Sequence, residues 1–217
     1  MVELITNPDA EVIAANLKRI EGELRAVSTT PPRILAATKY VAGEHLPILY
    51  EGGLRLVGEN RAQDLESKAA AHGELFEWHF IGQLQSRRVR TILPHVSLIH
   101  SVASESALRE LERHRDLARP GAGVLIEVNV SEEEGKAGVA PADLARYIER
   151  SPLPVQGLMT MPPLAGAAEA SRPWFAALRE LAARHELGQL SMGTSQDYLV
   201  AAEEGATIVR IGTSLYH

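Results

Sequence analysis

The stretch GVLIEVNV at residues 123–130 is the clearest secondary-structure signal in the chain, an apolar run rich in β-branched residues. A run of this length and composition, with turn residues before it, predicts a strand buried in a sheet. Similar short apolar runs recur along the 217 residues and alternate with longer amphipathic runs. The predicted strands are 33–38, 55–57, 77–81, 96–100, 123–130, 155–159, 189–192 and 207–211.

Helical periodicity fills the segments between these strands. A leading helix is predicted at about 9–27, where Ile13, Leu17, Ile20 and Leu24 recur at helical spacing. The other predicted helices are 43–51, 61–71, 85–93, 105–117, 141–150, 168–186 and 196–204.

Regular alternation of strands and helices is typical of an α/β protein with a parallel sheet. Eight strands in this order favour a single TIM-like (β/α)8 barrel, with one domain covering 1–217. The alternative is an open, doubly wound sheet. The barrel is preferred because no glycine-rich dinucleotide-binding turn follows the first predicted strand.

Composition excludes several classes of function. The formal net charge of −6 argues against a nucleic-acid partner bound through broad phosphate neutralisation. No apolar run approaches the length needed to span a membrane, and we expect no membrane partner. The absence of cysteine excludes thiol catalysis and disulfides, and no metal-binding spacing is found among the histidines. Without a signal peptide at Met1, we expect a cytoplasmic protein.

Ligands of such barrels bind where strands end and loops begin, so polar residues at those positions are site candidates. Lys39 follows ILAAT at the end of the first predicted strand. A lysine buried at the barrel mouth would be kept as a neutral amine that attacks an aldehyde. Considered alone, Lys39 is better explained as a side chain that reaches into solvent from a strand end. Asn60, after the second strand, could be a simple helix cap.

Two loops near the C-terminus are small and rich in hydroxyl groups. The seventh strand leads into Ser191, Gly193, Thr194 and Ser195, and the eighth leads through Arg210 into Gly212 and Thr213. Loops after strands seven and eight form a phosphate site in many barrels of this kind. Their position at adjacent strand ends, opposite a strand-end lysine, favours a ligand that carries both an aldehyde and a phosphate.

Several longer motifs, in order, resemble the YggS/PROSC family of pyridoxal 5′-phosphate (PLP) homeostasis proteins. The resemblance covers nearly the whole chain and rests on ILAATKY around Lys39, GENRAQD at 58–64, WHFIGQLQSRR at 78–88, IEVNVSEEEGKAG at 126–138, GLMTMPP at 157–163, LSMGTSQDY at 190–198 and VRIGTSLY at 209–216. That family is in turn similar to the barrel domain of alanine racemase, a fold-type III PLP protein.

The resemblance implies a role for each candidate residue. Lys39 would hold PLP as a Schiff base, and Arg210 would face the pyridine nitrogen. Asn60 would lie near the ring oxygen. The phosphate contacts would come from Ser195, Gly212 and Thr213, with Ser191, Gly193 and Thr194 in the same loop.

The resemblance also implies a carrier of PLP that takes part in intracellular PLP homeostasis, vitamin B6 balance and cofactor supply to apo-enzymes. Arg210 would leave the ring nitrogen unprotonated, which weakens carbanion stabilisation. The β domain of alanine racemase, which carries its second base, is not expected in this chain, and no tyrosine stands in a matching context. We therefore expect no useful turnover, a monomer, and transient contacts with amino acids and PLP-dependent apo-enzymes. The alternatives are a weak amino-acid racemase and a PLP-free barrel enzyme that uses Lys39 for an aldolase-like reaction.

Overall fold

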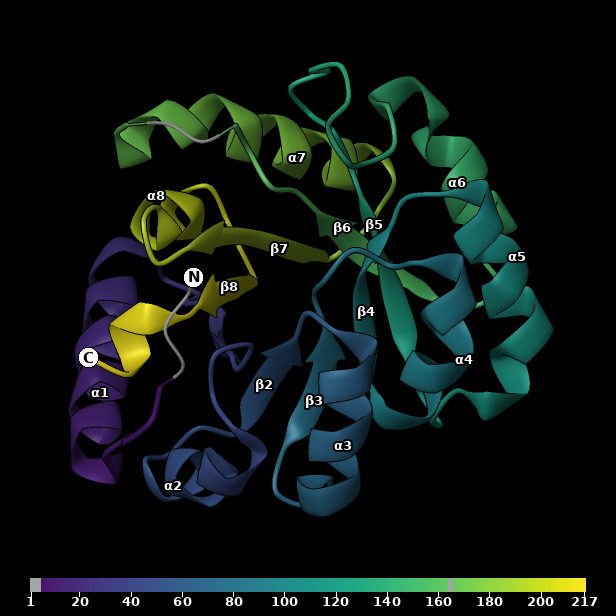
Figure 1. Ribbon diagram of the computed structural model, residues 1–217. Helices are drawn as coiled ribbons and strands as arrows, with labels where there is room; N and C mark the ends of the chain where they lie inside the picture. Colours follow the sequence, from purple (N-terminus) through teal and green to yellow (C-terminus); the bar gives the residue numbers. More distant parts are fainter. Residues whose placement is uncertain (1–4, 164–165) are drawn as a thin grey trace.

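The computed structural model describes residues 5–163 and 166–217, so positions 1–4 and 164–165 of the predicted 1–217 domain lie outside the described residues. Eight parallel strands close into a barrel in sequence order, β1 to β8, as the alternating pattern predicted (Figure 1). The strands are β1 (Arg33–Ala37), β2 (Leu56–Glu59), β3 (Glu77–Phe80), β4 (Leu98–Val102), β5 (Gly123–Glu127), β6 (Val155–Met159), β7 (Gln189–Thr194) and β8 (Ile208–Ile211). The barrel closes where Leu35 of β1 lies opposite Arg210 of β8.

Helices cover the outside of the barrel (Figure 1). They are α1 (Ala10–Val27), α2 (Leu46–Glu51), α3 (Ala62–His72), α4 (Val89–Ile92), α5 (Glu105–His114), α6 (Leu144–Arg150), α7 (Arg172–Arg184) and α8 (Tyr198–Glu203). The leading helix begins where predicted, because the Asp9 carboxylate accepts hydrogen bonds from the backbone N–H groups of Glu11 and Val12. Among residues 5–163 and 166–217, no helix has the length and apolar character that crossing a bilayer requires.

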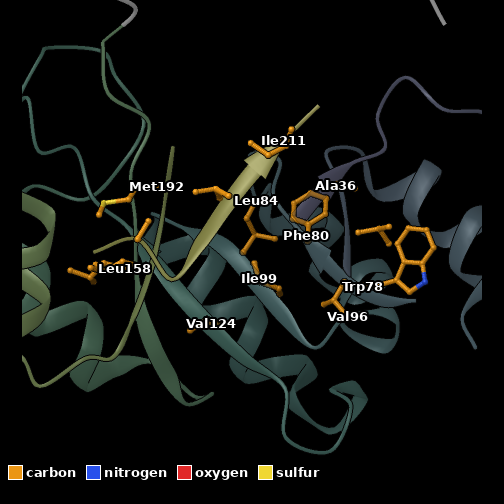
Figure 2. Packing of buried hydrophobic residues seen from close by; sticks show 14 of the residues in the cluster. Ala36, Trp78, Phe80, Leu84, Val96, Ile99, Val124, Leu158, Met192 and Ile211 are labelled. Atoms are coloured by element: carbon orange, nitrogen blue, oxygen red, sulfur yellow. The ribbon is translucent and has the colours of Figure 1, made fainter. Parts of the chain in front are cut away.

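Two apolar clusters hold the barrel together. The larger one lies between the strands and the helices and includes Trp78, Phe80 and Ile99, whose packing is shown in Figure 2. The smaller one fills the inside of the barrel with one side chain from each of several strands, namely Leu35, Leu56, Leu98, Leu125, Met159 and Ile208. Side chains alternate along a strand between these two clusters, because successive residues point to opposite faces of a sheet.

The structure corrects several element boundaries. The run predicted as a strand over 123–130 ends as a strand at Glu127, and Val128 forms an isolated bridge with Val139. The predicted strand at 55–57 lies instead at Leu56–Glu59, which places Glu59 inside the sheet. The helix predicted at 85–93 divides into short 3-10 and α turns over 86–95 that include Pro94, a residue without an N–H to continue a helix.

Candidate functional site

A cavity of about 450 Å³ opens at the carboxyl ends of the strands. Its walls come from the ends of strands on opposite sides of the barrel, which is where ligands of this architecture bind. Most of the candidate residues line it: Lys39, Asn60, Thr194, Ser195, Arg210, Gly212 and Thr213. The fold therefore brings together residues from both ends of the sequence.

Lys39 lies in the turn that follows β1 and is exposed. Its amine sits 4.5 Å from the centre of the Tyr40 ring, and both residues line the cavity. This exposure matches the interpretation of Lys39 as a side chain that reaches into solvent, because β1 ends at Ala37 and Lys39 lies in the turn that follows the buried Thr38. The amine is thus accessible from solvent and from the cavity.

A buried ion pair supports the turn beneath Lys39. Glu59, the last residue of β2, is fully buried and forms a salt bridge with the amine of Lys68, which is 7% exposed. The same carboxylate accepts from the Thr38 hydroxyl at 2.7 Å and from the Asn60 backbone N–H at 3.1 Å. The Lys68 amine also donates to the Thr38 carbonyl oxygen at 2.9 Å. These contacts join the ends of β1 and β2, and sequence reasoning did not identify either partner.

Asn60 places a polar atom that lacks a hydrogen-bond partner at the cavity. Its side-chain oxygen Oδ1 is buried, and no donor among the described residues reaches it. A buried acceptor left without a partner costs about 1–3 kcal/mol. Because Asn60 lines the cavity, a ligand hydroxyl that donates to Oδ1 would remove this cost.

Arg210 brings a buried positive charge to the cavity from β8. Its guanidinium donates to Ser191 Oγ at 2.5 Å, to the Thr160 carbonyl oxygen at 3.0 Å and to Met161 Sδ at 2.8 Å. Burial lowers the pKa of Arg210 to about 10, although the negative charges of Glu127 and Asp197 oppose that shift. The group is therefore a cation at neutral pH and can only donate hydrogen bonds.

Glu127 is a second titratable group of the cavity, and sequence reasoning missed it. It ends β5, is 7% exposed and lines the cavity together with Arg210. Burial raises the pKa of Glu127 above its usual value, and the positive charge of Arg210 opposes that rise. The available signal was the single carboxylate in the apolar run GVLIEVNV.

The two hydroxyl-rich loops touch each other. The Gly212 backbone N–H donates to Ser195 Oγ at 3.2 Å. Asp197 holds the first loop, since its Oδ1 accepts from the Thr194 N–H at 2.7 Å and from the Thr194 hydroxyl at 3.1 Å. Among the described residues, nothing accepts from the backbone N–H of Ser195 or Thr213. Uncommitted N–H groups of this kind suit an anion.

Two candidate residues lie behind the cavity instead of lining it. Ser191 is fully buried inside the barrel, where it contacts Arg210. Gly193 has a φ of +89°, and a Cβ there would lie 2.5 Å from the Cβ of Ala201. Gly193 therefore permits the close packing of β7 against α8, a structural role that the sequence did not separate from ligand binding.

Comparison with known proteins identifies relatives over the whole length of this barrel. The family model described as alanine racemase, N-terminal domain, matches residues 9–217. A pyridoxal phosphate homeostasis protein of Aquifex aeolicus is 44% identical over 85% of this chain and 86% of its own length. One of the same name from Pseudomonas aeruginosa is 38% identical over 95% of this chain and 94% of its own length.

Solved structures also match the fold of this chain. PipY of Synechococcus elongatus, with PLP bound, superposes with a TM-score of 0.81 at 32% identity and covers 94% of this chain and 100% of its own. Alanine racemase of Bartonella henselae shares the fold, with a TM-score of 0.73 at 14% identity, over 96% of this chain and 59% of the racemase. The chain belongs to the alanine racemase N-terminal domain family and, within it, to the pyridoxal phosphate homeostasis proteins.

Proposed function

We propose that this protein binds PLP in the cavity at the carboxyl ends of its strands and takes part in intracellular PLP homeostasis. The observation that carries the proposal is one cavity that combines an accessible amine, Lys39, with the unsatisfied oxygen of Asn60 and the buried cation Arg210. The names of the curated relatives and the PLP-bound structure of PipY support it.

Each part of PLP has a chemically suitable partner in this cavity. The loops that contain Ser195, Gly212 and Thr213 would hold the phosphate, with Thr194 fixing the first loop. The hydroxyl on the ring would donate to Asn60, and the ring nitrogen would accept from Arg210. When bound, PLP supplies an aldehyde that condenses with amines, and Lys39 is the lysine that lines the cavity and would anchor it covalently.

The chemistry of Arg210 favours a carrier over an enzyme. A carboxylate opposite the ring nitrogen would keep that nitrogen protonated, whereas a guanidinium can only donate to it. Electron withdrawal by the ring is then weaker, and racemisation in such a site needs two bases on opposite faces of the substrate. The curated relatives are named homeostasis proteins, in keeping with this proposal.

Weak racemase activity is the alternative, and two residues favour testing it. Racemisation requires proton exchange on both faces of the substrate. Besides Lys39, the cavity contains the phenol of Tyr40 and the carboxyl group of Glu127, which could exchange such a proton. Chiral chromatography after incubation of the PLP-loaded protein with amino acids distinguishes the two functions, since a carrier produces no multiple-turnover racemisation.

The proposal extends to partners and assembly. PLP-dependent apo-enzymes of the cytoplasm would receive the cofactor, and free amino acids would compete for its aldehyde. We propose a monomer in which 1–217 act as one domain. The large apolar side chains that are exposed in the described residues, Val12, Leu117 and Met161, lie on separate elements and do not indicate a continuous apolar interface.

The experiment that tests the function compares Lys39→Ala with the matched control Lys136→Ala, which changes a lysine outside the cavity. We expect the wild type and the control, but not Lys39→Ala, to show the near-visible absorbance of covalently bound PLP. Borohydride reduction and peptide mapping should then place the pyridoxyl group on Lys39. Circular dichroism checks that Lys39→Ala is folded. A reduced adduct found mainly on Lys136, or unchanged absorbance in Lys39→Ala, would overturn the assignment.

A further inference from the structure

A continuous chain of hydrogen bonds crosses the inside of the barrel from Arg210 to its opposite end. Arg210 contacts Ser191 Oγ at 2.5 Å, and Ser191 Oγ lies 2.8 Å from His100 Nδ1. His100 Nε2 lies 2.9 Å from His79 Nδ1, and His79 Nε2 lies 2.9 Å from Glu77 Oε1. Glu77 begins β3 and is 39% exposed, so the chain reaches solvent at the amino ends of the strands.

The chemistry of the two end groups, together with the neutrality of the two imidazoles, determines the direction of every bond between them. A guanidinium only donates, so Ser191 accepts from Arg210 and its own proton is free for His100 Nδ1. A carboxylate only accepts, so His79 Nε2 must carry a proton toward Glu77. In a neutral His79, Nδ1 is then an acceptor, and His100 Nε2 must donate to it. With both imidazoles neutral, both are protonated at Nε2 and aligned in one direction.

Burial agrees with this assignment, although the hydrogen bond to Glu77 opposes it by raising the pKa of His79. His79 is 1% exposed and His100 is fully buried, and burial lowers the pKa of each imidazole below its usual value. The hydrogen bond from His79, ahead of the contact with Arg33, holds the pKa of Glu77 well below its usual range despite the opposing effect of burial. Glu77 is therefore ionised at neutral pH.

We propose that Glu77, His79 and His100 are positioning residues for Arg210, and that the charge of Glu77 polarises the chain that holds the guanidinium in the cavity. The inference rests on the proposed function in one respect, namely that Arg210 contacts the bound cofactor. Aligned hydrogen bonds strengthen one another, so the carboxylate makes Ser191 a better acceptor for Arg210. A plain structural role for these histidines would require only that their nitrogens be satisfied, with no effect of the Glu77 charge on Arg210.

The direction of the hydrogen bonds in this chain is measured in the cofactor-free protein by NMR. In protein labelled with ¹⁵N-histidine, the nitrogen shifts should show a proton on Nε2 of both residues, and a coupling across the hydrogen bond should link His100 Nε2 as donor to His79 Nδ1. Finding the proton of either imidazole on Nδ1 would overturn the proposal. This measurement needs no PLP, so failure of PLP binding cannot be mistaken for failure of the chain.

The effect of charge is tested with Glu77→Gln against Arg33→Gln. Both changes remove the salt bridge between Arg33 and Glu77, but only the first removes the negative charge at the end of the chain. We expect the proton on His100 Nε2 to shift upfield in Glu77→Gln and to change little in Arg33→Gln. Equal shifts in the two variants would refute polarisation by Glu77.

The link to the cofactor is read in the loaded protein. Glu77→Gln should shift the absorption maximum of bound PLP and raise its dissociation constant by about fivefold, the effect of one weakened hydrogen bond. Arg33→Gln should change neither. If the NMR result holds while both variants bind PLP as the wild type does, the chain does not act on the cofactor through Arg210.

Discussion

Removing the amine of Lys68 is expected to destabilise the barrel strongly, because it leaves the Glu59 carboxylate buried without a countercharge. Glu59 is fully buried and Lys68 is 7% exposed, so water cannot take over the role of the amine. Loss of one partner from such a pair costs about 3–5 kcal/mol. For a chain of this length, about 2–4 °C is lost for each kcal/mol, so Lys68→Met should lower the melting temperature by roughly 6–20 °C.

Thermal and urea unfolding followed by circular dichroism provide the assay. The matched control is Lys136→Met, because Lys136 pairs with the exposed Glu133 at 3.6 Å, and such pairs contribute little. The double variant Glu59→Leu/Lys68→Met should recover much of the lost stability, since it removes both charges from the interior. A loss for Lys68→Met no larger than that of the control, or a double variant no more stable than the single one, would refute the reasoning.

Two further predictions concern the cavity. Ser195→Ala and Thr213→Val should each raise the dissociation constant of PLP by about tenfold or more, because a hydrogen bond to a charged group contributes roughly 1.5–3 kcal/mol; equal binding of PLP and pyridoxal in a titration would rule out the phosphate site. Burial raises the pKa of Glu127 above 4.5, so the folded protein holds this proton more tightly than the unfolded chain and loses stability as the pH rises through that window. Glu127→Gln should therefore gain stability over the wild type as the pH rises above 4.5 in urea unfolding, and a difference that stays constant during that rise would contradict this assignment.

The architecture could be predicted because each strand carries its own local signal. Apolar β-branched runs such as the one before Glu127 are typical of strands buried in a sheet, and the amphipathic runs between them provide the helices that cover it. The ends of the strands are harder to predict than their order. The sequence pattern continues through Val128 to Val130, and only the pairing with neighbouring strands shows that β5 ends at Glu127.

The parts of the site that the sequence did not reveal depend on partners far away along the chain. Lys68 lies on an amphipathic helix, where a lysine is ordinarily on the solvated face, and its burial follows from the position of Glu59. His79 likewise becomes part of a chain of hydrogen bonds only because β3 and β4 place it beside His100. The way the strands assemble into the barrel decides whether a polar residue in an apolar strand finds a hydrogen-bond partner on another strand.

Barrel closure also explains why the ends of this sequence meet in one site. The pairing of β1 with β8 sets Leu35 opposite Arg210, so the turn that contains Lys39 emerges beside the loop that contains Gly212. In an open doubly wound sheet, the first and last strands would not close on each other, and no single cavity would join Lys39 to these loops. The prediction of the aldehyde-phosphate site thus depends on the prediction of the barrel, since the site can form only if the sheet closes. Measuring the pyridoxyl adduct on Lys39 together with the loss of affinity in Thr213→Val therefore tests the closed topology in solution as well as the function.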